Sequence, residues 1–166
     1  MNTNLESIIP LLNKNLKIIQ RSDYFNFSID SLLISEFVNI QKNTKKILDL
    51  GTGNAAIPLF LSKKTSAKIY GIEIQEISYE LALRNININN LNEQIYIIYD
   101  NMKNYSNHFN MGAFDIVISN LSPRSVKKVQ NQAISGRMGD FSLRFPSLQN
   151  QHYSGFTLNQ YGVASP

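Results

Sequence analysis

"ILDLGTGNAAIPLFL", residues 47–61, contains the signals of a strand, a glycine loop and a helix in that order. The short apolar run ends at the turn Gly51-x-Gly53, and helical character resumes after it. Two glycines let the backbone turn tightly and approach a ligand without a Cβ in the way. Pro58 is compatible with the helix only in or near its first turn. The stretch therefore predicts a strand that delivers a glycine loop to the start of a helix.

The same alternation of strand and helix signals runs along the first 120 residues. Short apolar or β-branched runs predict four strands, at residues 45–50, 67–74, 94–99 and 114–119. Near-continuous apolar strands separated by helices are typical of a parallel sheet covered on both faces. The fold class is therefore α/β.

Two helices outside the opening stretch carry apolar stripes. One spans residues 76–90 and stops at Asn89-Asn90, and the other spans residues 28–40 with Ser28 or Asp30 as its N-cap. The predicted buried stripes are Ile77, Leu81, Ala82 and Ile88 in the first helix, and Leu32, Leu33, Phe37 and Ile40 in the second.

The composition of the chain changes at the bond between Asn120 and Leu121. Residues 1–120 hold 11 basic and 11 acidic residues, whereas residues 121–166 hold five basic residues against Asp140, so the net charge of +4 lies entirely in the second part. Isoleucine falls from 20 to one and asparagine from 18 to three across that bond. We therefore expect a domain at residues 1–120 and a tail at residues 121–166. The tail is interpreted as a loop-rich or disordered extension, as a sequence joined from another source or reading frame, or as a small cap domain.

Several kinds of protein are excluded by what the sequence lacks. There is no cysteine, and His108 and His152 form no ligand pattern, so we expect neither disulfides nor a metal site. No signal-peptide core is present and no apolar run approaches about 20 residues. The expectation is a soluble, cytoplasmic protein without a membrane partner.

Polar residues follow the predicted strands where each strand ends. Asp49 precedes the glycine loop, Glu73 lies 22 residues beyond Gly51, and Asp100 and Asn101 follow the third strand. Carboxyl ends of parallel strands meet at one edge, where open α/β sheets bind ligands. A carboxylate at Glu73 can accept bonds from two ribose hydroxyls, and one at Asp100 from an adenine amine. The alternatives are that the glycine loop is a turn without a ligand, that Glu73 is a solvated glutamate at a strand end, and that the polar group after the third strand is a helix N-cap. Ala56 stands at the third position of the dinucleotide fingerprint.

These stretches resemble a known family. "ILDLGTGNAAIPLFL", "GIEIQ" and "YDN" resemble the cofactor motifs of class I S-adenosylmethionine-dependent methyltransferases. The upstream "LKIIQRSDYFNFSIDSLLISEFV" looks like the amino-terminal signature of the bacterial tRNA(Val) adenine N(6)-methyltransferases. The resemblance covers about residues 16–120 and implies a Rossmann-like sheet, incomplete here, with S-adenosylmethionine as cofactor.

The resemblance also implies roles for individual residues. In that family a phenylalanine-serine-x-aspartate segment closes over the cofactor, which points to Phe27, Ser28 and Asp30. By the same resemblance the methionine end of the cofactor is flanked by Asp49, Gly51 and Gly53, the ribose is bound by Glu73, and the adenine by Asp100 with Asn101 beside it.

The catalytic motif of the family is interrupted. Its fourth strand ends in Asn-Pro-Pro-Tyr, whose asparagine and following carbonyl accept bonds from the target amine and whose aromatic ring stacks on the base. This chain has Asn120 and then Leu121, Ser122 and Pro123, so both prolines and the aromatic ring are missing at their expected positions. Asn120 is the candidate catalytic residue.

The resulting functional hypothesis is methylation of the exocyclic amine of adenine in RNA, with a tRNA as the expected substrate and turnover by this chain impaired. The alternatives are methylation of a protein glutamine, and a catalytically inactive cofactor-binding or interaction module. A nucleotide-dependent oxidoreductase is a more distant alternative. Because the fourth strand lacks its family neighbour, we also expect this apolar edge to self-associate or to be covered by the tail.

Overall fold

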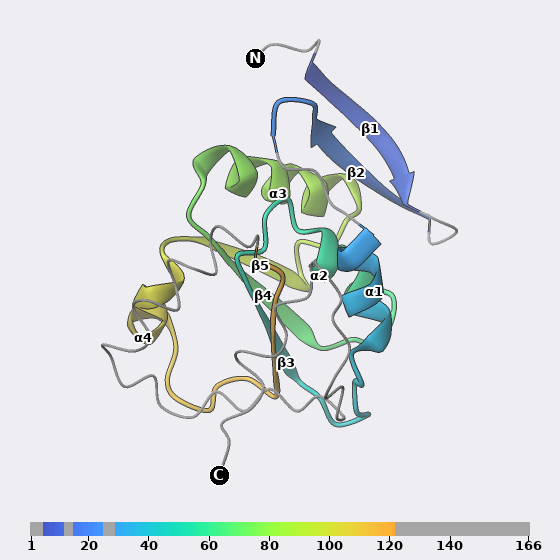
Figure 1. Cartoon of the computed structure of the whole chain (residues 1–166). Helices are drawn as coiled ribbons and strands as arrows, with labels where there is room; N and C mark the ends of the chain where they lie inside the picture. Colours follow the sequence, from blue (N-terminus) through green and yellow to red (C-terminus); the bar gives the residue numbers. More distant parts are fainter. Residues whose placement is uncertain (1–4, 12–14, 25–28, 122–166) are drawn as a thin grey trace, which may run out of the picture.

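The computed structural model describes residues 5–11, 15–24 and 29–121 (Figure 1). Within these ranges, four parallel strands form one sheet in the order β5-β4-β3-β6. The strands are β3 (Lys46–Leu50), β4 (Lys68–Glu73), β5 (Ile95–Tyr99) and β6 (Ile116–Ser119). The predicted α/β fold and its four parallel strands are thus confirmed. The predictions for the tail from residue 122 onward lie outside the described residues.

Helices connect the strands and set the strand order. They are α1 (Ile29–Phe37), α2 (Ala56–Ser62), α3 (Glu76–Ile88), the 3-10 helix η2 (Met102–Asn104) and α4 (Tyr105–His108). From β3 the chain steps through α2 to β4 and through α3 to β5, and then returns to place β6 on the other side of β3. This reversal beside β3 is the switch point at which open α/β sheets form a ligand crevice.

One face of the sheet forms the main core with α1, α2 and α3. Ile47, Ile69, Ile95 and Ile118 are almost fully buried in this core. Strand register places Ile47 beside Ile69 and Ile69 beside Ile95, so equivalent side chains point to the same face. Leu59 and Phe60 of α2 pack into the same cluster. This arrangement explains why the strands are rich in isoleucine.

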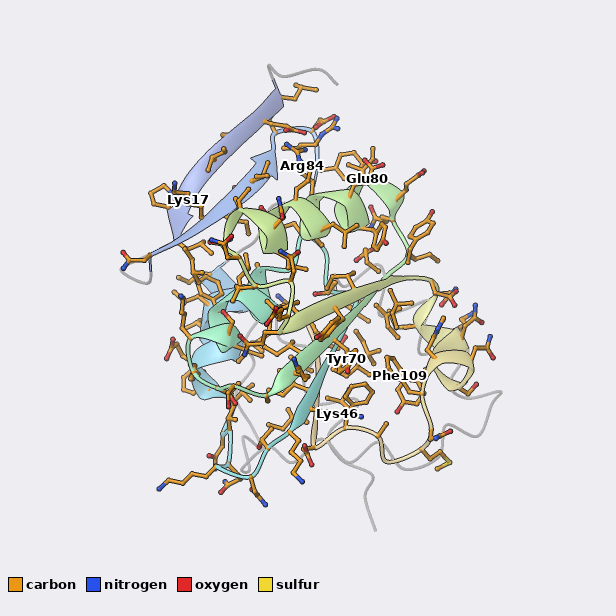
Figure 2. All side chains as sticks on the ribbon, turned by 180° about the vertical axis from the view of Figure 1, so that it is seen from behind. Lys17, Lys46, Tyr70, Glu80, Arg84 and Phe109 are labelled. Carbon is orange, nitrogen blue, oxygen red and sulfur yellow. The ribbon has the colours of Figure 1, made fainter. Side chains whose placement is uncertain are left out.

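The opposite face is covered by aromatic rings. Tyr70 of β4 stacks on Tyr96 of β5 with ring centroids 5.3 Å apart, and it meets Phe109 and Phe114 edge-on. Figure 2 shows Tyr70 and Phe109 lying close together between the sheet and the segment that follows α4. Edge-on and offset ring pairs stabilise such contacts beyond the area they bury. The sheet is therefore covered on both faces, by helices on one and mainly by rings on the other.

A hairpin that the sequence analysis did not predict precedes the sheet. β1 (Glu6–Leu11) and β2 (Leu16–Arg21) pair antiparallel and lie across α3 (Figure 1). Leu11, Leu16 and Ile18 join the main core. Arg84 of α3 reaches the hairpin (Figure 2) and forms a two-pronged ion pair with Glu6, with nitrogen–oxygen distances of 2.9 and 2.7 Å.

The predicted helix stripes were wrong in part. Phe37 is 72% exposed and Ile88 is 37% exposed, although both were assigned to buried stripes. The buried positions are Ser31, Ile34, Ser35 and Val38 near α1, and Ser78, Leu81, Ala82, Asn85 and Ile86 in α3. Leu81 and Ala82 are buried as predicted, whereas buried polar residues such as Ser35 and Asn85 occupy positions that a count of apolar residues skips. Asp30 lies within the first turn of α1 and is therefore not its N-cap.

Two further features concern the surface. Among the described strands β6 lies at the edge of the sheet, and the expected self-association through that edge stays a prediction.

No helix in the described ranges has the length and apolar character needed to cross a membrane.

Because Ile69 is fully buried in the central strand β4, we predict that Ile69→Ala lowers the free energy of unfolding by about 2–5 kcal/mol. Ile8→Ala is the matched control, since Ile8 is 63% exposed on β1 and should change stability by less than about 0.5 kcal/mol. Urea unfolding followed by circular dichroism measures both. Equal losses in the two variants would contradict the core described above.

Candidate functional site

The carboxyl ends of the four parallel strands bring the predicted residues to one edge. The register aligns Leu50 with Ile72 on one side and with Ser119 on the other, and it aligns Glu73 with Tyr99. The residues gathered there are Asp49, Gly51, Gly53, Glu73, Asp100, Asn101 and Asn120. Phe27 and Ser28 lie outside the described residues.

The glycine loop folds back onto β4. Gly51 and Gly53 both have positive φ, +71° and +59°, which a residue with a Cβ adopts only at a cost. The backbone N–H groups of Gly51 and Thr52 both donate to the Ile72 carbonyl, at 2.9 and 3.1 Å. A Cβ at Gly71 would lie 2.7 Å from Thr52 Cγ2, so the loop can approach β4 only because residue 71 has no side chain.

Asp49 is a buried carboxyl under this loop. It is 1% exposed, and its Oδ2 accepts a 2.7 Å hydrogen bond from Thr52 Oγ1. Its Oδ1 is also buried and has no hydrogen-bond partner among the described residues. Burial raises the pKa of Asp49 to about 7; the Thr52 bond opposes this rise and the negative charge of Glu73 adds to it. Asp49 Oδ1 is therefore a buried acceptor that lacks a donor among the described residues.

Glu73 binds the loop and the start of α3 together. One carboxylate oxygen accepts from the Gly53 N–H at 2.8 Å, and the other accepts from the Ile74 and Gln75 N–H groups at 2.9 and 2.8 Å. The residue is only 5% exposed. Glu73 thus lies at the carboxyl edge of the sheet with its oxygens already accepting three backbone donors, and its predicted role in binding ribose stays a prediction.

Asp100 and Asn101 serve their own loop in this structure. Asp100 Oδ1 accepts from the Asn101 N–H and from Asn104 Nδ2, while Oδ2 lies 2.6 Å from His108 Nε2. These partners, His108 foremost, hold the pKa of the Asp100 carboxyl below its usual value. Asn101 is the N-cap of η2, with its side chain accepting from the Lys103 N–H. The alternative of a capping role therefore describes Asn101, whereas Asp100 is bonded within its own loop and to His108.

Asn120 lies directly after β6, beside the glycine loop. Its amide nitrogen donates to Ser31 Oγ of α1 at 3.3 Å, and the preceding Ser119 hydroxyl donates to the Leu50 carbonyl at 3.0 Å. These bonds fix the end of β6 against β3 and α1. The Leu121 side chain then covers Gly51, where a Cβ would overlap Leu121 Cδ2.

The structure adds site residues that sequence reasoning missed. Asn54 is 6% exposed, and its side-chain nitrogen is buried without a hydrogen-bond partner among the described residues. Ile74 and Tyr99 are 54% and 52% exposed at the same edge, and Tyr99 lies 5.3 Å from the Tyr79 ring. Their positions in the sequence could have indicated them, because Ile74 directly follows Glu73 and Asn54 directly follows Gly53.

The donor and acceptor set fits the amino-acid end of S-adenosylmethionine. Asp49 Oδ1 is an acceptor suited to an ammonium group, and Asn54 Nδ2 is a donor suited to a carboxylate. A Cβ placed at Gly53 would have no atom within 4 Å, so the space beside this glycine is open. No group of three His, Asp or Glu side chains that could hold a metal ion occurs in the described part of the chain.

Comparison with known proteins places these features in a family. The family model described as ribosomal protein L11 methyltransferase (PrmA) matches residues 30–137. A tRNA1(Val) (adenine(37)-N6)-methyltransferase of Bacteroides fragilis is 28% identical over 91 residues, which cover 55% of this chain and 38% of the relative. A protein of the same name from Haemophilus influenzae is 27% identical over 109 residues, covering 64% and 46%. The chain thus spans less than half the length of these curated relatives.

Solved structures share the fold. The Pyrococcus abyssi tRNA (uracil-54, C5)-methyltransferase, in complex with S-adenosyl-L-homocysteine, superposes with a TM-score of 0.53 at 22% identity, covering 76% of this chain and 32% of that one. Pyrococcus horikoshii TYW2, in complex with MeSAdo, gives a TM-score of 0.59 at 13% identity, covering 77% and 47%. With the family match extending over more than half of its residues, the chain belongs to the PrmA-type family of S-adenosylmethionine-dependent methyltransferases.

Proposed function

We propose that this chain binds S-adenosylmethionine and is the cofactor domain of a methyltransferase that acts on the exocyclic amine of adenine in RNA, with tRNA as the proposed substrate. The observation that carries the proposal is a pair of buried atoms without a hydrogen-bond partner among the described residues, at the switch point of the sheet. They are Asp49 Oδ1 at the end of β3 and Asn54 Nδ2 on the glycine loop. When bound, the cofactor supplies an electrophilic methyl group on a sulfonium centre.

The residues of the chain divide the binding of this cofactor between them. Asp49 accepts from the ammonium group and Asn54 donates to the carboxylate. Glu73 accepts from the ribose hydroxyls, which must share or replace the three backbone donors it now holds. Asp100, with Asn101 beside it, accepts from the adenine amine after releasing donors such as His108. Phe27, Ser28 and Asp30 are proposed to contribute to cofactor binding, as the resemblance implies.

Asn120 is proposed to orient the target amine. Its amide oxygen accepts a hydrogen bond from the amine, which turns the nitrogen lone pair toward the methyl group. The Ser31 hydroxyl and the Ser119–Leu50 bond hold the asparagine in place. Leu121 and Ser122 replace the two prolines of the family motif, so the backbone after Asn120 is less rigid. We therefore propose that methyl transfer by this chain is weak.

RNA is favoured as the substrate by the names of the relatives from Bacteroides fragilis and Haemophilus influenzae, both tRNA adenine methyltransferases. A protein substrate is the second candidate. The family match and a Carboxydothermus hydrogenoformans relative, 26% identical over 85 residues, both carry the name ribosomal protein L11 methyltransferase. A parallel assay with tRNA and with ribosomal protein as acceptors separates the two.

Calorimetric titration of S-adenosylmethionine into the chain should show saturable binding in the micromolar range, about −8 kcal/mol. Asp49→Ala and Glu73→Ala should abolish it, because each removes an acceptor at the cofactor edge. Glu93→Ala is the matched control, since Glu93 is exposed before β5, at the opposite edge of the sheet. No binding by the unaltered chain would overturn the proposal.

Binding should also release a proton below about pH 7. Asp49 has a raised pKa of about 7, and a cationic ligand group favours its ionised form. Affinity should therefore increase as the pH rises toward about 7 and level off above it. Titrations at pH 6 in buffers of different ionisation enthalpy measure the released proton, and Asp49→Asn should remove the buffer dependence.

The same raised pKa predicts the sign of the pH dependence of stability. The folded state binds more protons at Asp49 than the unfolded state between about pH 3.8 and pH 7, so this group makes stability fall as pH rises through that window. Asp49→Asn should be more stable than the unaltered chain at pH 8, by more than ~1 kcal/mol. Thermal unfolding of the variant and of the unaltered chain, at pH 5 and at pH 8, measures the stability difference between them. A smaller difference at pH 8 than at pH 5 would contradict a raised pKa at Asp49.

Methyl transfer from tritiated S-adenosylmethionine into bulk tRNA should stay close to background even where cofactor binding is clear. The expected cause is the loss of the prolines and the stacking ring after Asn120. Incorporation well above background that disappears in Asn120→Ala would show that Asn120 still works and that the motif is not impaired.

A further inference from the structure

The side chain of Asn85 is an amide buried in the middle of α3, with none of its surface exposed. A buried amide is tolerated when its donors and acceptor are paired. Its Oδ1 accepts from the Ile19 N–H at 2.6 Å, and its Nδ2 donates to the carbonyl of Ile19 at 3.3 Å and to that of Asn54 at 2.9 Å. One side chain thus joins β2, α3 and the glycine loop, which are far apart in the sequence.

On the side of the hairpin, side-chain amides from α3 and its C-cap bond the backbone of β2, as the backbone of a neighbouring strand would. Asn89, one turn after Asn85, accepts from the Lys17 N–H at 2.9 Å and donates to the Lys17 carbonyl at 2.7 Å. Asn85 makes the same pair of bonds with Ile19. The two amides therefore satisfy the edge of β2 that faces away from β1, residue by residue. The hairpin is docked by these backbone bonds as well as by its apolar side chains.

Toward the cofactor loop, the two asparagines differ. Asn85 bonds the Asn54 carbonyl, whereas the remaining Asn89 bond goes to the Asn85 carbonyl in the same helix. The Asn54 carbonyl belongs to the peptide that precedes Ala55, a residue without glycine's freedom that is held at φ +66°. Such a conformation persists when surrounding bonds over-determine it. The Asn85 bond is one of these, together with the 3.1 Å bond from the Ala55 N–H to the Thr52 carbonyl.

We propose that Asn85 is a positioning residue for the cofactor loop and that, through it, the docked β1–β2 hairpin forms part of the cofactor site. This inference rests on the proposed function, in which the glycine loop and Asn54 hold S-adenosylmethionine. When the hairpin is docked, the Asn85 amide is anchored at Ile19 and presents its N–H to the Asn54 carbonyl. When the hairpin is displaced, that anchor is lost and the strained segment at Ala55 is released.

Coupling of this kind is reciprocal. If hairpin docking favours the bound shape of the loop, cofactor binding must favour hairpin docking by the same factor. S-adenosylmethionine should therefore slow hydrogen exchange at the Ile19 and Lys17 amides, although both lie in the hairpin and outside the expected binding residues.

The test compares Asn85→Ala with Asn89→Ala in the full chain. Each variant removes the two hydrogen bonds between one asparagine side chain and the backbone of one β2 residue. Only Asn85→Ala also removes the hydrogen bond to the Asn54 carbonyl of the glycine loop. We expect Asn85→Ala to weaken S-adenosylmethionine binding at least tenfold by calorimetry and to speed exchange at the Ala55 amide. Asn89→Ala should lower the unfolding temperature while changing affinity less than twofold. If Asn85→Ala does not fold, Asn85→Ser replaces it.

Two outcomes overturn the inference. One is a folded Asn85 variant with unchanged affinity and unchanged Ala55 exchange, and the other is an equal loss of affinity in the Asn89 variant. If the unaltered chain binds no S-adenosylmethionine, the proposed function fails separately. The Ala55 exchange rate then decides the coupling by itself, and a rate equal to that of the unaltered chain rejects it.

Discussion

The carboxylate of Glu73 is the constraint on which the functional edge depends. It accepts one N–H from the glycine loop and two from the turn that enters α3, so it joins the end of β3, the end of β4 and the start of a helix. Three backbone donors give this buried carboxylate the hydrogen-bond partners that burial requires. The close approach that this requires is possible because Gly71 leaves room for Thr52. The shape of the loop therefore follows from one acidic side chain and one missing side chain.

A second consequence concerns the state of the site. Glu73 and Asp100 already accept protein hydrogen bonds, whereas Asp49 Oδ1 and Asn54 Nδ2 have no partner among the described residues. In the proposed mode of binding, the methionine end of the cofactor would meet these unsatisfied groups, and the nucleoside end would have to exchange with existing hydrogen bonds. Unsatisfied buried groups carry a free-energy cost that a ligand can remove.

Sequence reasoning succeeded where the physical signal is local. The strands were found because a parallel sheet buries both faces and demands continuous apolar runs, and their polar ends follow automatically. It failed where a buried position is polar. Asn85 and Ser35 are fully buried, yet an apolar count assigns such residues to the surface, so Ile88 and Phe37 were placed inward instead. The hairpin was missed because its outer strand is mostly exposed and its inner strand needs the amides of α3.

The sequence by itself determined the α/β alternation, the glycine loop and the line of polar residues at the strand ends. Each of these depends on neighbours in the chain, through periodicity, turn chemistry and the fixed direction of parallel strands. Only the tertiary structure decided which polar atoms are paired. Glu73 accepts one N–H from the loop and two from the turn before α3, and Asp100 pairs with His108. Asn85 joins the hairpin to Asn54 of the glycine loop, which lies 31 residues before Asn85 in the chain. Hydrogen-bond partners are set by proximity in space, and burial makes each pairing obligatory.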